Sequence, residues 1–148
     1  MANDNGMKAF NAAIERLKRD VPAKVVKALV TSGNELAATQ RKFAETSRDT
    51  GALVDSITVT LPGQTTPPYS QPGGSRVAGP TEVIVTAGNS DVRYAHLVEY
   101  GASKTEAQSF FWSAFRLTRK RNESRIDRAG RKATKEAWSG KPAGGEDA

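Results

Sequence analysis

The stretch Ile57-Thr58-Val59-Thr60-Leu61 decides the fold class, because it interrupts a sequence whose longest segments have helical patterns. It is rich in β-branched residues and alternates between apolar and polar side chains, which is typical of a half-buried strand. Glu82-Val83-Ile84-Val85-Thr86-Ala87 has the same character, and the turn-forming residues 88–91 follow it. We therefore predict two strands, at 57–61 and 82–87.

Residues 62–80, between these strands, have the composition of a long loop. They hold five of the seven prolines and four of the thirteen glycines, which disfavours regular structure. Loops of this length are uncommon inside compact domains and are often binding segments. We therefore predict a long loop that is either a binding arm or a disordered excursion.

The residues before the first strand predict helices over 7–47. Apolar residues recur every three or four positions from Met7 to Val21, and the pattern resumes from Val25 to Phe43. Pro22 suits the first turn of a helix, so we predict that one helix ends and a second begins there. The polar residues 1–6 are expected to be flexible.

The residues after the second strand predict a third strand at about 94–100 and a basic helix over 108–138. The apolar residues of 94–100 do not alternate cleanly, which leaves a short helical turn as the alternative. Glycine and proline follow the helix, so residues 139–148 are expected to form a disordered tail. Together these elements predict one α+β domain over 1–148, in which a small antiparallel sheet packs against long N-terminal helices and a C-terminal helix.

The net charge of +6 comes from a single segment. Residues 116–135 contain nine basic and two acidic residues, a net charge of +7, while the other 128 residues sum to −1. Basic side chains at helical spacing suit a phosphate backbone or an acidic protein, and a solvated face is the alternative. The candidate anion- or DNA-binding residues are Arg121, Arg125, Arg128, Lys132 and Lys135.

Composition excludes several kinds of chemistry. The chain has no cysteine and one histidine, His96, which excludes disulfides, zinc–thiolate sites and thiol nucleophiles. No run approaches the roughly 18 apolar residues of a membrane span, and the first residues lack a secretory pattern. We therefore predict a protein without cofactor or metal and without a membrane partner.

Asp49-Thr50-Gly51 matches the signature of aspartic proteases, in which two such carboxylates share a proton. A homodimer would supply the second carboxylate. The polar residues before Asp49 do not form the apolar strand that a protease aspartate follows. The segment instead predicts a helix exit, with Gly51 at positive φ and Asp49 or Thr50 capping a turn over 52–56.

Two further patterns lack residues that their chemistry needs. The segment 101–105 ends like a phosphate-binding loop, but Ser103 stands where glycine must precede the lysine. His96 and Glu99 have the spacing of a metal pair, but no second histidine or cysteine supplies a third ligand. No serine nucleophile motif is present either, so we predict that the protein is not an enzyme.

Two separated blocks resemble a family of small phage proteins. The first is Asp49-Thr50-Gly51-Ala52-Leu53 with Ser56-Ile57, and the second is Tyr94-Ala95-His96-Leu97-Val98-Glu99-Tyr100-Gly101 with Lys104-Thr105, Phe110 and Ala114-Phe115. Their combination resembles the tail-component or tail-completion proteins of long-tailed phages. These are related to the lambda-type minor tail protein Z and are also described as head–tail joining or neck proteins. The resemblance covers about Val21 to Arg121.

The chain departs from the family pattern at the start of its last helix. Ser109 stands where the family usually has proline before phenylalanine, and Trp112 and Ser113 stand where arginine and proline are common. Since proline fixes φ, these differences bear on the entry geometry of that helix.

The resemblance implies a structural virion protein of the head–tail junction, made in the host cytoplasm and located in the tail or neck. It implies a homo-oligomeric ring of six copies that meets the tail tube or terminator and the neck's head-closure or adaptor proteins. It also implies that the 62–80 loop is mobile and becomes ordered on docking. Tail terminator, head closure and nucleic-acid binding through the basic helix are the alternatives. An aromatic and polar cluster beside a turn supplies the candidate contact residues, Tyr94, His96, Glu99, Tyr100 and Lys104.

Overall fold

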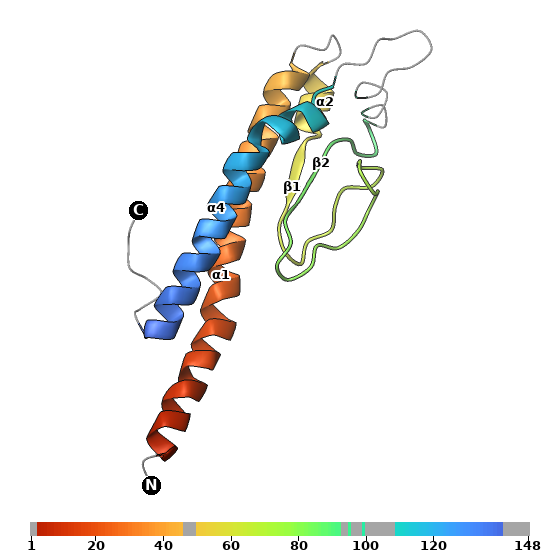
Figure 1. The fold of residues 1–148 in the computed structure, drawn as a ribbon. Helices are drawn as coiled ribbons and strands as arrows, with labels where there is room; N and C mark the ends of the chain where they lie inside the picture. The colour runs from red at the N-terminus through yellow and green to blue at the C-terminus, as the bar shows by residue number, and fades with distance from the viewer. Residues whose placement is uncertain (1–2, 46–49, 93–94, 96–98, 100–108, 141–148) are drawn as a thin grey trace.

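The computed structural model describes residues 3–45, 50–92, 95, 99 and 109–140. Two long helices lie side by side, and the other elements gather near one end of the pair (Figure 1). The elements in chain order are α1 (Asn3–Ala44), α2 (Thr50–Asp55), β1 (Thr58–Thr60), β2 (Ile84–Thr86) and α4 (Phe111–Ser139). This arrangement confirms the predicted α+β class.

Helix α1 is one continuous helix of 42 residues that contains Pro22. The predicted break at Pro22 is therefore wrong. Proline inside a helix removes one backbone hydrogen bond at a cost of about 3 kcal/mol, but packing of the helix elsewhere can offset that cost. The helix begins at Asn3 and so includes four of the residues 1–6, whose flexibility stays a prediction.

Helices α1 and α4 pack along each other with small side chains at their contact. Ala13, Ala28, Ala133 and Ala137 are buried, so the two backbones can approach closely. Near the far end, the Nε of Arg16 donates to the carbonyl of Ala137 at 2.8 Å. We call this pair of helices the arm.

Strands β1 and β2 form a two-stranded antiparallel sheet in which Thr58 pairs with Thr86 and Thr60 with Ile84. The sheet packs on α1 at Gly33, because a Cβ at that position would lie 3.0 Å from a methyl carbon of Val83 and 3.3 Å from one of Val59. Glycine therefore lets the helix backbone approach the valines. Both strands are shorter than the predicted 57–61 and 82–87 but lie within them.

The 62–80 loop has no helix or named strand, yet it folds back on itself. Thr65 and Val77 form an isolated bridge. The buried hydroxyl of Thr66 donates to the carbonyl of Gly74 at 3.0 Å and accepts from the amide of Arg76 at 2.8 Å. These hydrogen bonds join the two halves of the loop, and its mobility before docking stays a prediction.

The main hydrophobic core lies where α2, the sheet and the adjoining ends of the long helices meet. Its largest fully buried side chains include Phe110, Leu53 and Ile57. The Oγ of Ser56 donates to the carbonyl of Leu53 at 2.7 Å and accepts from the amide of Gly88 at 3.0 Å, which ties α2 to the end of the sheet. We call the part of the molecule outside the two long helices the head. The adjoining ends of those helices also contribute to its core.

The structure bears on four further predictions. Ala95 and Glu99, the described residues of 94–100, are helical, which agrees with the alternative to the third strand. Gly51 lies inside α2, so its predicted positive φ is wrong. The basic helix, expected over 108–138, spans Phe111–Ser139, and Gly140 ends it in the left-handed region at φ 77°. The disordered tail was predicted over 139–148, of which 141–148 lie outside the described residues.

Candidate interaction surfaces

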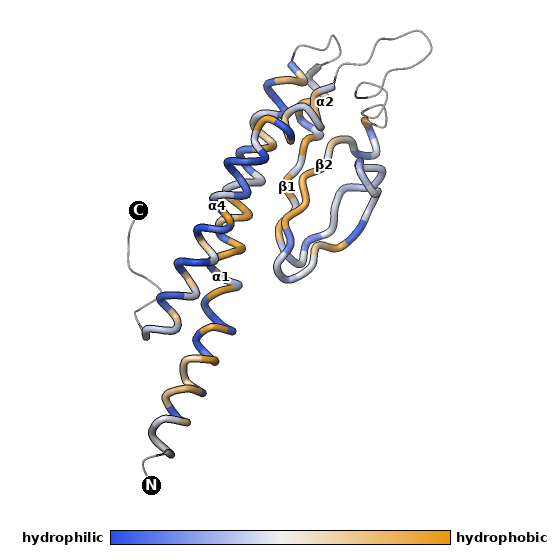
Figure 2. Tube along the Cα trace, viewed as in Figure 1, coloured by the Kyte–Doolittle hydropathy of each residue, from blue (hydrophilic) through white to orange (hydrophobic). Residues whose placement is uncertain are grey.

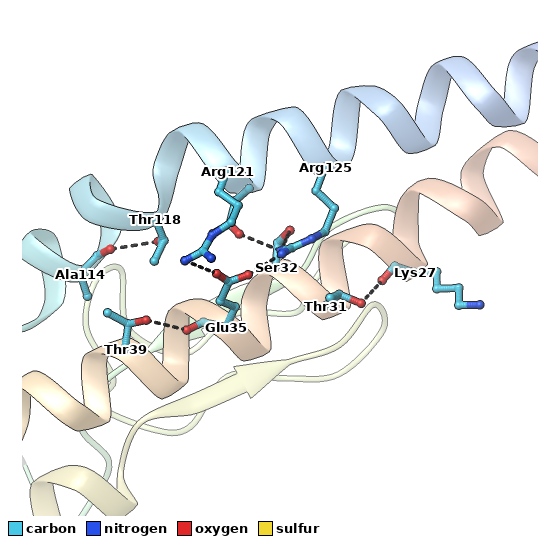
Figure 3. A network of polar contacts seen from close by, with 10 residues as sticks. Lys27, Thr31, Ser32, Glu35, Thr39, Ala114, Thr118, Arg121 and Arg125 are labelled. Atoms are coloured by element: carbon cyan, nitrogen blue, oxygen red, sulfur yellow. Dashed lines mark hydrogen bonds and ion pairs between the residues drawn. The ribbon is translucent and has the colours of Figure 1, made fainter. Parts of the chain in front are cut away.

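Glu35 of α1 holds two of the predicted anion-binding arginines of α4 (Figure 3). One of its carboxylate oxygens lies 2.8 Å from Arg121, and the other lies 2.5 Å from Arg125. Arg125 also donates to the Oγ of Ser32 at 3.1 Å and to the side-chain oxygen of Asn122 at 3.0 Å. The side chains of Arg125 and Glu35 are 28% and 23% exposed, so this cluster fastens the arm internally.

The other three predicted basic residues are exposed on α4. Lys132 lies 4.0 Å from Glu136, one turn further along the helix. Arg128 and Lys135 have no carboxylate within salt-bridge distance among the described residues. Contact of these side chains with an anion stays a prediction.

Arg116, Lys120 and Arg131, which the sequence analysis did not select, are also exposed. An open groove is lined by Ser124, Asp127, Arg128, Arg131, Lys132 and Lys135. A second groove nearer the head is lined by Arg116, Leu117, Arg119, Lys120 and Glu123. The helical period could have indicated these residues, because positions near multiples of 3.6 from Lys120 face away from the buried alanines.

The charge of the arm exceeds that of the basic segment alone. Helix α1 has eight basic and four acidic residues, and α4 has nine and three, which gives the arm a net charge of +10. The rest of the chain has five basic and nine acidic residues, a net charge of −4. The 128 residues outside 116–135, whose net charge is −1, therefore combine the basic helix α1 with an acidic head.

Glu99 caps the N-terminus of α4 from about eleven residues earlier in the chain. Its carboxylate accepts from the backbone amides of Phe110, Phe111 and Trp112 at 2.9, 2.8 and 3.2 Å. The hydroxyl of Ser109 donates to it at 2.8 Å. These amides have no partner within a helix, so the buried carboxylate satisfies them and complements the helix dipole. Ser109 thus contributes a bond that the family's proline would lack.

A small cavity of about 50 Å³ adjoins this carboxylate. Its other walls are mostly apolar and include Pro72, Ala87 and Phe111. Because Glu99 already accepts four hydrogen bonds, it fastens the helix entry. Its predicted role as a contact residue stays a prediction.

The remaining candidate contact residues, Tyr94, His96, Tyr100 and Lys104, lie outside the described residues, as does Asp49 of the protease-like motif. The described part of the chain contains no group of three or more residues suited to hold a metal ion. Nor does it contain a helix with both the length and the apolar character to cross a membrane.

Comparison with known families gives a match over residues 8–101, which include most of α1, all of α2 and the sheet. The matching model is described as "Bacteriophage HK97-gp10, putative tail-component". The chain belongs to this HK97-gp10-like family. No curated protein and no solved structure gives a significant match.

Membership confirms the resemblance drawn from the two sequence blocks, although the matched region ends before α4. An HK97-gp10-like tail component is a structural protein of the virion, and it contacts other virion proteins. The family favours a structural role over an enzymatic one.

Proposed function

We propose that this tail component is a structural subunit of the head–tail junction, in which a homo-oligomeric ring of six copies connects the tail tube to the neck. The observation that carries the proposal is the distribution of exposed apolar side chains. They lie at the tip of the arm, on α4 and on the 62–80 loop of the head, where a ring subunit would meet an axial partner and two neighbours.

The tip of the arm, away from the head, carries Met7, Phe10 and Trp138. Their exposed fractions are 60%, 51% and 53%. The rings of Phe10 and Trp138 meet edge to face with centroids 6.1 Å apart, and Met7 lies one turn before Phe10. Clustered exposed apolar side chains mark interaction sites more often than scattered ones do.

Helix α4 and the 62–80 loop carry further exposed apolar residues. Leu117 of α4 is 68% exposed, and Val77 of the 62–80 loop is 61% exposed. Figure 1 shows α4 and the sheet with its loop on different sides of α1, and Figure 2 shows apolar residues along α1 between them. A contact between unlike sides repeats head to tail and closes into a ring if the rotation allows it.

Charge also favours contact between unlike surfaces. The arm has a net charge of +10 and the rest of the chain −4. Two arms facing each other would repel, whereas an arm facing the acidic part of a neighbour would attract it. This asymmetry disfavours a two-fold dimer through the arms.

Native mass spectrometry of the purified full chain tests the ring. We expect a hexamer that Val77→Asp converts to smaller species, since the new charge would be buried at the subunit contact. Thr81→Asp adds the same charge at another exposed position near the loop and should leave the hexamer intact. A wild-type protein that stays monomeric with and without its tail-tube partner would contradict the proposal.

A phage that lacks this chain tests the place in the virion. We expect filled heads and separate tails that fail to join until the protein is added. Tails of abnormal length would favour the tail-terminator alternative, and heads that lose their DNA would favour head closure.

A further inference from the structure

We propose that the outward face of α4 binds the phosphate backbone of double-stranded DNA through a row of free cations. The outer row, as we call it, consists of the exposed basic residues of α4 that have no carboxylate partner in the described part of the chain: Arg116, Lys120, Arg128, Arg131 and Lys135. The proposal does not depend on where the protein lies in the virion.

The outer row consists of the basic residues of α4 that do not take part in the ion pairs of the arm. Arg121 and Arg125 are held by Glu35, and Arg119 bonds Glu123 at 2.8 Å. Lys132 lies within reach of Glu136. Each of these four cations already pairs with a carboxylate, so a phosphate would have to compete with that carboxylate. At the outer row no carboxylate partner among the described residues competes with the phosphate.

The row has the length and spacing of a backbone-binding surface. From Arg116 to Lys135 it covers 20 residues of helix, and the 19 rises of 1.5 Å between them make about 29 Å. Arg128, Arg131 and Lys135 follow each other at helical spacing and line one open groove in which Asp127 is the only carboxylate. Like charges at this spacing destabilise a helix, and a bound polyanion would remove that repulsion.

The chemistry of the row favours DNA over an acidic protein. Protein interfaces centre on buried apolar and aromatic anchors. Leu117 and Trp138 lie near the two ends of the row, and between Lys120 and Lys135 no large apolar side chain is exposed. A phosphate backbone needs only spaced cations, and binding through them is independent of base sequence.

Fluorescence anisotropy with a mixed-sequence DNA duplex of about 30 base pairs tests the proposal on the full chain. The logarithm of the association constant should fall with the logarithm of salt concentration with a slope of about −4.5 for five phosphate contacts. The triple variant R128E/R131E/K135E should bind at least about a hundredfold more weakly near 0.1 M salt, with a slope smaller by about 2.7.

The matched control is K8E/K18E/K27E, which makes the same change in net charge at exposed positions of α1. It should keep its affinity within about threefold. Equal losses in both variants would overturn the site, because binding would then follow net charge alone. A duplex that fails to bind, or that binds without salt dependence, would overturn the proposal, as would stronger binding of poly-glutamate of equal charge.

Discussion

The arm and the head are each stabilised by a different kind of internal contact. In the head, large side chains such as Phe110, Leu53 and Ile57 are almost fully buried, and Glu99 supplies four hydrogen bonds at the entry of α4. In the arm, the buried contacts are alanines, and the cluster at Glu35 adds polar bonds. The arm therefore leaves apolar and basic side chains on its surface for partners, while the head buries the largest side chains.

Truncation of an aromatic ring in each region gives the largest expected contrast. Phe110→Ala should lower the free energy of unfolding by about 3–5 kcal/mol, because the ring is 2% exposed in the head. Phe10→Ala removes a half-exposed ring at the arm tip, whose contact with Trp138 is worth about 1 kcal/mol. Urea denaturation measures both, and similar losses would show that the arm tip is as tightly packed as the head.

Removal of the charge at Glu99 comes next in size. Glu99→Gln should cost about 1–3 kcal/mol, because buried amides of α4 would lose their charged acceptor. Hydrogen exchange at Phe110, Phe111 and Trp112 should quicken. Glu123→Gln makes the same change at an exposed pair on α4 and should cost under about 1 kcal/mol. Unchanged exchange at the three amides would contradict the capping role.

The polar cluster at Glu35 is expected to contribute less to the free energy of unfolding than the capping carboxylate of Glu99. A double-mutant cycle with Glu35→Gln and Arg125→Gln should give a coupling of about 1 kcal/mol, since the pair is partly shielded and has further hydrogen bonds. The exposed pair of Arg119 and Glu123 should give about 0.3–0.5 kcal/mol in the same cycle. The order of these two couplings decides whether Glu35 fastens the arm.

Substitution of glycine by alanine in the two long helices should have opposite signs. Gly33→Ala places a methyl against Val83 and Val59 of the head, so we expect a net loss of about 1 kcal/mol after the gain in helix propensity. Gly130→Ala meets only Val25 at an ordinary 3.8 Å and should gain about 0.5–1 kcal/mol. Thermal unfolding of both variants measures the signs, and a stabilised Gly33→Ala would mean that the valines can move aside.

The smallest effect concerns pH at the 62–80 loop. Hydrogen bonds from Arg76 and from the amide of Gly79 hold the pKa of Glu82 below its ordinary value of 4.5. A depressed pKa contributes stability that is fully present above the unfolded value and is lost as the pH falls through the folded one. An NMR titration should show this pKa, and Arg76→Gln should raise it toward 4.5. If Glu82 titrates near 4.5 in both proteins, the hydrogen bonds that it accepts from Arg76 and from the amide of Gly79 do not form in solution.

The family pattern and the patterns of local structure were accessible from the sequence because they depend on neighbouring residues. Apolar spacing indicated the long helices, and β-branched alternation indicated both strands of the sheet. Proline and glycine content indicated the irregular 62–80 loop. Pro22 was misread because local preference favours a helix start there, whereas the structure continues one helix through it.

The sequence by itself determined the two kinds of element, the basic character of α4 and the membership in a tail-component family. Only the tertiary structure showed that Arg121 and Arg125 are paired, because Glu35 lies about 90 residues before Arg125 in the chain. It also decided the role of Glu99, which caps amides that start a helix eleven residues later. Such pairings depend on how distant segments pack, and helical or strand periodicity carries no information about them.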